Sequence, residues 1–430
     1  MCESDVVSRT VLVVGGGGRE HALVRAIARS PERPRILCAG GNAGIAADAE
    51  LIPLHLDDVG GVVALSSVYG VDLVVVGPEA PLVAGLCDGL RAAGIRAFGP
   101  SAAAARLEGS KAFAKEVMAA AGVPTARAVT VTDVEAGMAA VAELGLPVAV
   151  KADGLAAGKG VMVVQTEAEA REALETCLVD AAFGAAGRVV VVEEGMTGPE
   201  VSLLAISDGK AVARFPAARD YKPIGEGNTG PNTGGMGSVS PVPDIPDDLA
   251  DRLIDEVHRP VIAEMERRGA PFSGVLYAGL MMTPDGPRVL EFNTRFGDPE
   301  TQALLPRLED DALGLLTAAA DGELPDRPVR VNDGAAVAVV LAAHGYPGTP
   351  RAGDVIEGLE AAAATGAEVY HAGTAPGERG TIVTSGGRVL AVSARGDSVA
   401  DARAKAYAAA DLITFEGRQM RRDIAAGMDG

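Results

Sequence analysis

The sequence predicts a mixed α/β and α+β protein that begins with a doubly wound α/β domain. Within residues 1–108, short runs rich in Val, Ile and Leu alternate with Ala-rich stretches. The runs at 10–14, 35–38 and 71–76 predict buried strands, and the stretch at 20–29 predicts a helix. Strands separated by helices in this rhythm indicate a parallel sheet with helices on both faces. Gly- and Pro-rich loops follow these strands, and ligands bind at the carboxyl ends of such strands.

The pattern changes after Gly109. A helix is predicted over 110–121, because Gly122 and Pro124 follow it as a stop signal. Val-rich runs around a Gly-rich loop come next and predict a small α+β unit of a size suited to a lid. The stretch 325–328, with a proline at each end, predicts a linker. We therefore predict domains at 1–108, at 109–328 with a lid subdomain at about 123–193, and at 329–430.

The composition restricts the classes of partner. The 430 residues carry a formal net charge of −20, which repels phosphate backbones, and Trp is absent, so we expect no nucleic-acid partner. No apolar run approaches the ~18 residues needed to cross a bilayer, and no signal peptide is visible. The four cysteines share no metal-ligand spacing, which is typical of reduced thiols; they are Cys2, Cys38, Cys87 and Cys177. We expect a cytoplasmic protein without membrane contact that acts on small molecules as a monomer or small homo-oligomer.

The first glycine run, at 15–18, lies between a predicted strand and a predicted helix. This placement aims backbone N–H groups and the positive end of the helix at an anion, which favours a phosphate or sugar-phosphate site. The dinucleotide fingerprint G-x-G-x-x-G is an alternative, but Glu20 stands at its third glycine. Ala39 and Gly40 stand where that fingerprint needs an acidic ribose-binding residue. A tight turn without a ligand is the remaining interpretation.

A second glycine-rich loop carries two lysines, Lys151 and Lys159, between the Val-rich runs at 148–151 and 161–164. A loop of this kind between antiparallel strands can fold over a triphosphate, supplying N–H donors and positive charge. It is not a Walker A loop, because G-x-x-x-x-G-K-[ST] is not matched. An ordinary surface turn has the same composition, so the loop alone does not decide between the two.

Two acidic residues, Glu193 and Glu194, end the Val-rich run at 189–192, and Glu200 follows shortly after. If the end of this strand lines an adenine pocket, its backbone could read the edge of the base and Glu200 could bind ribose hydroxyls. Acidic residues that end a strand and face water are the alternative.

The segment 289–300 has the features of a metal site. Residues i and i+2 of a strand share a face, so Glu291 and Asn293 are expected to point the same way. One carboxylate and one amide oxygen form an incomplete shell, which Mg²⁺ accepts when ATP phosphates and waters complete it. Arg295, two residues further, is suited to a carboxylate or a phosphate. A solvated polar strand face is the alternative.

The loop at 229–237 contains four glycines, one asparagine and two threonines. Small residues of this kind let the backbone approach a ligand closely. An inert connector is the alternative reading for this loop alone.

Together, these motifs resemble the glycinamide ribonucleotide synthetase family, also called phosphoribosylamine–glycine ligases, within the ATP-grasp superfamily. The resemblance covers essentially the whole chain. Its motifs lie at 17–21, 42–44, 76–82, 107–111, 151–161, 230–237, 274–279, 291–302, 345–348 and 371–374.

The resemblance implies an N-terminal α/β domain, an ATP-grasp pair of α+β subdomains that clamp the nucleotide, and a small C-terminal α+β domain. The residues implied to hold ATP are Lys111, Lys151, Gly158, Lys159, Gly160, Glu193, Glu194 and Glu200. Those implied to bind Mg²⁺ or Mn²⁺ are Glu291 and Asn293. Those implied to bind the sugar phosphate, the amino acid or the acyl phosphate are Gly17, Gly18, Asn42, Glu79, Asn232, Thr233, Gly234 and Arg295. The catalytic residues implied are Lys151, Lys159, Arg295 and Asp220.

The reaction implied is the ATP-dependent ligation of glycine to 5-phosphoribosylamine in de novo purine synthesis. An acyl phosphate would form first, and the products would be glycinamide ribonucleotide, ADP and phosphate. A related ligase for another amino acid or amine is the main alternative. A nucleotide-binding module without activity and a dinucleotide-dependent oxidoreductase are the other two.

One segment departs from the family pattern. The family reads Gln-Asp-His-Lys-Arg and then Asp-x-Gly-Pro-Asn-Thr, whereas this chain has Arg219, Tyr221, Pro223 and Asn228 at the variant positions. Our hypothesis is that Arg219 replaces the guanidinium absent at 223 and keeps a positive charge near the substrate anion. These departures leave the identity of the amino acid and the amine open.

Overall fold

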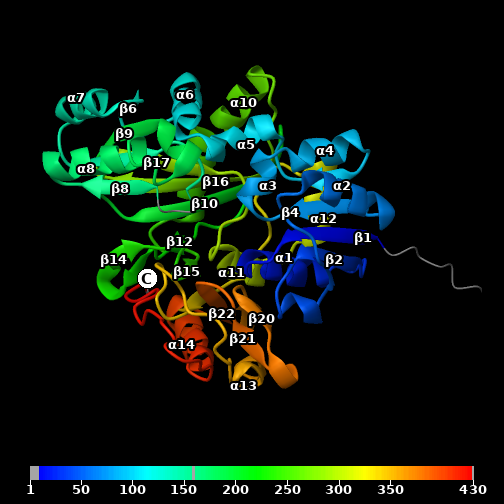
Figure 1. The fold of residues 1–430 in the computed structure, drawn as a ribbon. Coiled ribbons are helices and arrows are strands. Elements are labelled where there is room, and N and C mark those ends of the chain that lie inside the picture. Colours follow the sequence, from blue (N-terminus) through cyan, green and yellow to red (C-terminus); the bar gives the residue numbers. More distant parts are fainter. Residues whose placement is uncertain (1–8, 157–159, 429–430) are drawn as a thin grey trace, which may run out of the picture.

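The computed structural model describes residues 9–156 and 160–428 (Figure 1). A parallel sheet forms the N-terminal part, in the order β3-β2-β1-β4-β5. The order reverses beside β1, so the sheet is doubly wound, as predicted, and the loops after β1 and β4 flank the point where such sheets bind ligands. Its elements are β1 (Thr10–Gly15), α1 (Gly18–Ala28), β2 (Arg35–Gly40), β3 (Glu50–Ile52), α2 (Val59–Val68), β4 (Leu73–Val76), α3 (Glu79–Val83), α4 (Leu86–Ala92), β5 (Arg96–Phe98) and α5 (Ala102–Gly109).

A four-stranded antiparallel sheet, in the order β6-β9-β7-β8, forms the unit predicted as a lid. The helices α7 and α8 pack on one face of this sheet, where Val148, Val150 and Val192 belong to the apolar core. Because side chains alternate along a strand, Lys151 and Glu193 lie on the opposite face. The elements are β6 (Ala128–Val131), α7 (Val134–Leu144), β7 (Val148–Ala152), β8 (Val161–Val164), α8 (Glu167–Leu178) and β9 (Val190–Glu194).

A second antiparallel sheet, in the order β11-β10-β16-β17, forms the body opposite the lid. Apolar cores cover it on both faces, since Val201 and Leu203 of β10 pack in one core and Leu204 and Ile206 in another. A π-helical turn (Ile254–His258) joins α9 to α10. The other elements are α6 (Lys111–Ala121), β10 (Glu200–Asp208), β11 (Val212–Arg214), α9 (Asp247–Leu253), α10 (Arg259–Arg267), β16 (Ser273–Thr283), β17 (Gly286–Asn293), α11 (Thr301–Leu304) and α12 (Ala312–Asp321).

The C-terminal sheet has the order β12-β15-β18-β22-β19 and takes strands from both sides of residue 328. The segment 219–240 therefore links the body to the C-terminal part. Two small hairpins, β13–β14 and β20–β21, stand beside this sheet. The elements are β12 (Arg219–Asp220), β13 (Pro223–Gly225), β14 (Thr229–Asn232), β15 (Gly237–Ser240), β18 (Ala335–Ala342), α13 (Leu359–Ala364), β19 (Glu368–His371), β20 (Thr374–Pro376), β21 (Ile382–Thr384), β22 (Arg388–Gly396) and α14 (Val399–Ala410).

Two predictions from composition can be compared with the structure. Within 9–156 and 160–428, none of the helices has the length and apolar character that crossing a membrane requires. Cys38, Cys87 and Cys177 are buried free thiols, as expected, whereas Cys2 lies outside the described residues. Burial raises the pKa of Cys38 and Cys87 to about 12, so both thiols stay protonated near neutral pH.

Candidate active site

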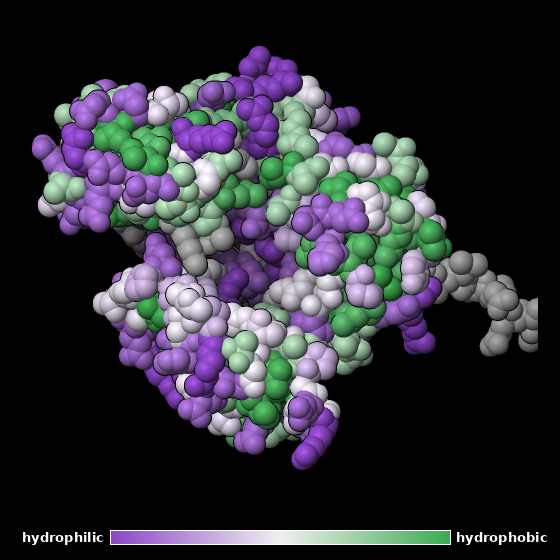
Figure 2. All heavy atoms as spheres, in the orientation of Figure 1, coloured by the Kyte–Doolittle hydropathy of each residue, from purple (hydrophilic) through white to green (hydrophobic). Residues whose placement is uncertain are grey.

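The lid, the body and the C-terminal sheet surround a hydrophilic recess. Figure 2 shows this hollow near the centre of the molecule, between the lobe that carries the lid and the lobe that carries β22 and α14. The polar motifs that the sequence places far apart along the chain converge on it.

Lys151 and Glu193 lie on the face of the lid sheet away from α7 and α8. The Lys151 ammonium donates to Glu193 Oε2 at 2.8 Å and to the carbonyl oxygen of Leu290 in β17 at 3.4 Å. Lys115 Nζ lies 3.2 Å from Glu193 Oε1, so two ammonium groups hold one buried carboxylate. Glu193 thus serves as a counter-ion in this structure, and its contact with adenine stays a prediction. The sequence reading missed Lys115, although it lies one helical turn after Lys111 in α6.

Lys111 and the base of the glycine-rich loop lie beside this pair. Lys111 Nζ donates to the carbonyl oxygen of Gly154 at 3.2 Å. Burial lowers the pKa of Lys111, with a smaller opposing effect from Glu291. Gly160 needs to be a glycine, because a Cβ there would approach the Cβ of Ala156 to 2.6 Å. Gly158 and Lys159, at the tip of the predicted phosphate loop, lie outside the described residues.

Glu194 joins the lid to the body. Its carboxylate accepts from Arg127 Nε of the lid at 2.7 Å and from Arg288 Nη1 of β17 at 2.9 Å. Glu200, at the start of β10, instead pairs with Lys222 at 3.0 Å. Contact of either acid with ATP stays a prediction.

Glu291 and Asn293 share a face of β17, and Lys222 reaches the same point. Lys222 Nζ lies 3.9 Å from Glu291 Oε1. Desolvation alone would raise the pKa of Glu291, but the positive charges of Lys222 and other nearby cations outweigh it and lower the pKa. Glu291 is therefore a carboxylate at neutral pH. Lys222 was not among the predicted site residues, because its neighbours here come from other elements.

Arg295 connects the metal face of β17 to the N-terminal sheet. Its Nη2 donates to Asn293 Oδ1 at 3.1 Å and lies 2.9 Å from Glu108 Oε1. Its Nε lies 3.4 Å from Glu79 Oε2. Burial alone would raise the pKa of Glu79, but Arg295 and Arg19 lower it. Two residues predicted separately, Arg295 and Glu79, are thus brought together, and Glu108 is a partner that the sequence reading missed.

The glycine loop after β1 is closely packed. Gly17 donates its N–H to Glu20 Oε2 at 2.6 Å, and Arg19 donates its backbone N–H to Asp298 Oδ2 at 3.1 Å. A Cβ on Gly18 would lie 2.6 Å from Gln302 Nε2. These glycines therefore let α1 begin against the segment after β17, and the predicted contact with a sugar phosphate stays a prediction.

Asn42 braces the same loop against the C-terminal sheet. Its amide N–H groups donate to the carbonyl oxygens of Gly16 at 2.9 Å and His371 at 2.8 Å. Its side-chain oxygen accepts from the N–H groups of Gly44 at 2.9 Å and Ile45 at 3.0 Å. Two donors and two acceptor sites are the full capacity of an asparagine amide. Asn42 therefore holds the loop in place, and direct substrate contact would require it to give up one of these bonds.

Asp220 is a half-buried acid with one buried, unused oxygen. Its Oδ1 has no hydrogen-bond partner among the described residues. Burial and the negative charge of Glu300 raise the pKa of Asp220 well above its usual value, against the charges of Lys222 and Arg388. Glu300 is itself occupied, accepting from Tyr277 Oη at 2.6 Å. An unpaired buried acceptor is costly unless a ligand satisfies it.

The loop after β14 is fixed by residues of the C-terminal part that the sequence reading missed. Tyr346 Oη accepts from the N–H of Gly234 at 2.9 Å. Arg388 donates to the carbonyl oxygen of Gly234 and, at 2.6 Å, to that of Asp298. Thr233 Oγ1 donates to the carbonyl oxygen of Lys222 at 2.6 Å. Asn232 is exposed at the end of β14.

Arg219 has partners of its own in this structure, and its proposed role near the substrate anion stays a prediction. Arg219 Nη2 pairs with Asp244 at 2.9 Å, and its Nε donates to the carbonyl oxygen of Glu200 at 2.9 Å. Its side chain is thus committed to its own surroundings. The guanidinium that contacts Pro223 and Asn228 belongs to Arg421.

We therefore expect Arg219→Gln to change kcat/KM by less than about twofold. An ion pair near the surface contributes about 0–1 kcal/mol, and the lower part of that range corresponds to a change of this size. Steady-state kinetics with each substrate varied would check this. A tenfold loss confined to one substrate would restore a role for Arg219 in binding it.

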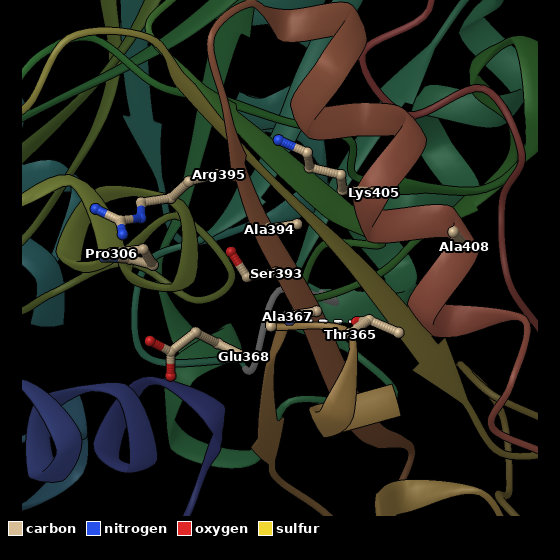
Figure 3. Close-up of a pocket in the computed structure, with 10 residues that line it drawn as sticks. Pro306, Thr365, Ala367, Glu368, Ser393, Ala394, Arg395, Lys405 and Ala408 are labelled. Atoms are coloured by element: carbon tan, nitrogen blue, oxygen red, sulfur yellow. Dashed lines mark hydrogen bonds between the residues drawn. The ribbon is translucent and has the colours of Figure 1, made fainter. Parts of the chain in front are cut away.

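A cavity of about 340 Å³ lies elsewhere, beside β19, β22 and α14 (Figure 3). Ser393, Arg395 and Lys405 line it together with the turn that precedes β19. None of the predicted site residues in the described part of the chain lines this cavity. It is therefore separate from the recess.

Comparisons with known proteins match the chain in three consecutive parts. Residues 9–108 match the family model of the phosphoribosylglycinamide synthetase N domain, 109–301 that of its ATP-grasp (A) domain, and 336–427 that of its C domain. A phosphoribosylamine–glycine ligase of Streptomyces coelicolor is 52% identical over 424 residues, covering 98% of this chain and 99% of the relative. One from Mesorhizobium japonicum is 51% identical over 414 residues, covering 96% and 97%.

Solved structures agree with this assignment. The crystal structure of phosphoribosylamine–glycine ligase from Thermotoga maritima has a TM-score of 0.84 and 33% identity, covering 97% of this chain and 100% of that one. A biotin carboxylase from Campylobacter jejuni, at 17% identity and a TM-score of 0.73, shares the fold. The three family models and the relatives that match over nearly the full length show that the chain belongs to the phosphoribosylglycinamide synthetase family of ATP-grasp ligases.

Proposed function

We propose that the chain ligates glycine to 5-phosphoribosylamine at the expense of ATP, giving glycinamide ribonucleotide, ADP and phosphate. The relatives of about half identity carry the name of this reaction. The observation in the site that carries the proposal is the positive charge around the carboxylate of Glu291. Lys222 Nζ lies 3.9 Å from it, and the charges of Lys222, Lys151 and Lys111 all lower its pKa. A cluster of cations around one acid suits a triphosphate and its metal ion.

ATP would lie between the lid and the body, with its phosphates near Lys111 and Lys151. The glycine carboxylate would attack the γ-phosphate, releasing ADP and forming an acyl phosphate. Lys151, Lys159 and Arg295 would stabilise the negative charge that develops, since fixed cations near a transferring phosphoryl group lower the barrier. Lid closure would keep water from the acyl phosphate until the amine attacks.

The residues on β17 fit a divalent metal that takes most of its ligands from elsewhere. Glu291 offers an ionised carboxylate, and Asn293 Oδ1 accepts one hydrogen bond from Arg295 and keeps a second acceptor site. The described residues contain no group of three or more His, Cys, Asp or Glu that could hold a metal alone. Mg²⁺ accepts one or two protein oxygens with phosphates and waters, so Glu291 and Asn293 would hold it. Bound there, Mg²⁺ would neutralise charge on the phosphate oxygens.

Asp220 is our candidate for the amino group of glycine. Its free Oδ1 would accept from the ammonium, and the ligand charge would favour the ionised carboxylate that burial and Glu300 otherwise disfavour. Arg295, held by Glu79 and Glu108, would face the carboxylate side of the same substrate.

The test is ADP release over a panel of amino acids, with and without phosphoribosylamine. We expect turnover with glycine to depend on phosphoribosylamine and to exceed that with alanine or serine. Equal or faster turnover with another amino acid, or with another amine, would replace the proposed substrate pair by that one. No ADP release with any pair would contradict a ligase activity.

Asp220→Asn should separate substrate binding from stability. A charge-assisted hydrogen bond to the ammonium is worth about 1.5–3 kcal/mol, so the KM for glycine should rise about ten- to a hundredfold. The pKa of Asp220 is higher in the folded protein than in the unfolded chain. Ionised Asp220 therefore lowers the free energy of unfolding at pH values above the unfolded pKa, and this loss becomes smaller as the pH falls. The amide variant carries no such charge, so its unfolding midpoint at neutral pH should be equal or higher. A lower midpoint with unchanged KM would assign Asp220 to the fold.

A further inference from the structure

The hairpin of β13 and β14, residues 223–232, borders the recess and has its apolar support on β13, where the half-buried Ile224 packs against a core. β14 is exposed along its whole length, and the 3-10 turn at 226–228 has no buried residue. A two-stranded hairpin is marginally stable by itself. Yet its two ends carry site residues, because Lys222 directly precedes β13 and Thr233 directly follows β14. Thr233 also donates its N–H to the carbonyl oxygen of Lys222 at 2.8 Å, so the ends move together.

Residues 421–428, which we call the C-terminal strap, supply the missing support. Arg421 Nη1 donates to the carbonyl oxygen of Pro223 at 3.1 Å and to Asn228 Oδ1 at 3.0 Å. One guanidinium nitrogen thus joins the first strand of the hairpin to its turn. Asn228 has a φ of 58°, a left-handed conformation that asparagine tolerates better than most residues.

The strap also caps the turn of the hairpin. Asp423 Oδ2 accepts from the N–H of Gly227 at 2.8 Å. Glu226 Oε1 accepts from the N–H of Arg422 at 3.0 Å. These polar contacts are the kind of support that an exposed turn requires when few apolar side chains are available.

Arg421 is held rigidly enough to act as a clamp. Its side chain is 1% exposed, and its Nε and Nη2 donate to the two carboxylate oxygens of Asp423 at 2.8 and 2.7 Å. The guanidinium lies over the ring of Tyr221, 5.2 Å from its centroid. Tyr407 Oη of α14 donates to the carbonyl oxygen of Arg421 at 2.8 Å, which anchors the strap to the C-terminal sheet and its helix.

We propose that Arg421 is a positioning residue for the amino-acid site, acting through the hairpin and not by touching substrate. The strap fixes the hairpin, and the hairpin fixes Lys222 next to Glu291 and the loop that leads through Thr233 to Gly235, which lies against Asp220. This inference rests on the proposed function for the identity of the substrate. It assigns a role in substrate binding to a segment of the chain that contains none of the predicted site residues.

Arg421→Ala is the first test. Loss of hydrogen bonds by a charged donor should raise the KM for glycine about tenfold, whereas the KM for ATP should change less than about twofold. The KM for ATP should change less because Lys111 and Lys151, two of the three lysines near Glu291, have no contact with the hairpin in the described residues, so that only Lys222 is affected. Arg421→Lys keeps the positive charge but loses the planar guanidinium with its several fixed donors, so it should give a smaller rise in the KM for glycine.

Hydrogen exchange gives a readout that does not depend on activity. The amide hydrogens of 224–230, 232 and 233 should exchange faster in Arg421→Ala, because local opening of the hairpin becomes easier. The matched control is Arg418→Lys in the preceding turn. Arg418 Nη1 donates to the carbonyl oxygens of Ala410 and Ile413 and its Nη2 lies 4.0 Å from Asp411, so none of these contacts involves the hairpin. This control should leave both hairpin exchange and the KM for glycine unchanged.

Asn228→Asp tests the clamp in the opposite direction. An aspartate would give the hydrogen bond from the Arg421 guanidinium a charged acceptor as well as a charged donor, so hairpin exchange should slow. The effect should vanish in the Arg421→Ala background, since residues that share one contact are non-additive.

Three outcomes decide the proposal. Faster hairpin exchange with a glycine-specific rise in KM supports it. Unchanged exchange in a folded Arg421→Ala protein, or an equal rise in the KM of every substrate, overturns it. A parent enzyme that releases no ADP with glycine and phosphoribosylamine contradicts the proposed function, while hairpin exchange still decides whether the clamp exists.

Discussion

Glu291→Ala should lower kcat by about 10³-fold, the upper end of the effect of removing one preorganised electrostatic group from an active site. Glu291 is the only carboxylate of the Glu-x-Asn pair on β17, and the structure lowers its pKa through the surrounding lysines. Without it, Asn293 alone would have to place the metal, and the ammonium groups of Lys111, Lys151 and Lys222 would lose a shared counter-charge. Both effects misplace the phosphates.

The measurement is ADP release at several Mg²⁺ concentrations, on protein whose unfolding midpoint has been checked. Asp285→Ala is the matched control, because it removes a carboxylate from the turn before β17. The Asp285 side chain is 84% exposed, and its Oδ2 makes a long contact of 3.9 Å with Arg288 Nη2. That variant should keep the parent activity. Near-parent turnover of folded Glu291→Ala at ordinary Mg²⁺ would contradict the metal assignment.

Lys151→Ala should raise the KM for ATP and lower kcat by about 10²-fold or more. The ammonium of Lys151 is buried at the end of β7, where it acts on phosphate in both the ground state and the transition state. Of its two ion-pair partners in the described residues, Glu193 would keep Lys115. A poorly compensated buried charge is costly, so some loss of stability is also expected.

Lys405→Ala offers a control for the loss of a lysine, since its side chain is 54% exposed and pairs with Asp401 on α14. Comparing Lys151→Ala with Lys115→Ala separates the binding of phosphate from the support of Glu193. Lys115 Nζ also donates to Thr125 Oγ1 and the carbonyl oxygen of Ala126, so its loss should lower stability more than catalysis. A change confined to the KM for phosphoribosylamine would place Lys151 on the other substrate.

The sequence by itself determined the local parts of this protein. Val-rich runs predicted β1, β7, β8 and β9 close to their observed bounds, because β-branched residues and alternation of side chains are properties of a few consecutive positions. The same holds for Glu291 and Asn293, whose shared face follows from the period of a strand. The sequence also predicted the family, because many motifs of that family occur along the whole chain in the same order.

Only the tertiary structure decided which residues share the recess. Glu193 lies between Lys115 and Lys151, Asn42 is occupied by its own neighbours, and Arg219 points to Asp244. Arg421 reaches Asn228 across 193 positions of sequence. The segment 219–240 joins a sheet whose other strands follow residue 328. Contacts over such separations depend on how finished sheets pack together, and a local pattern carries no information about them.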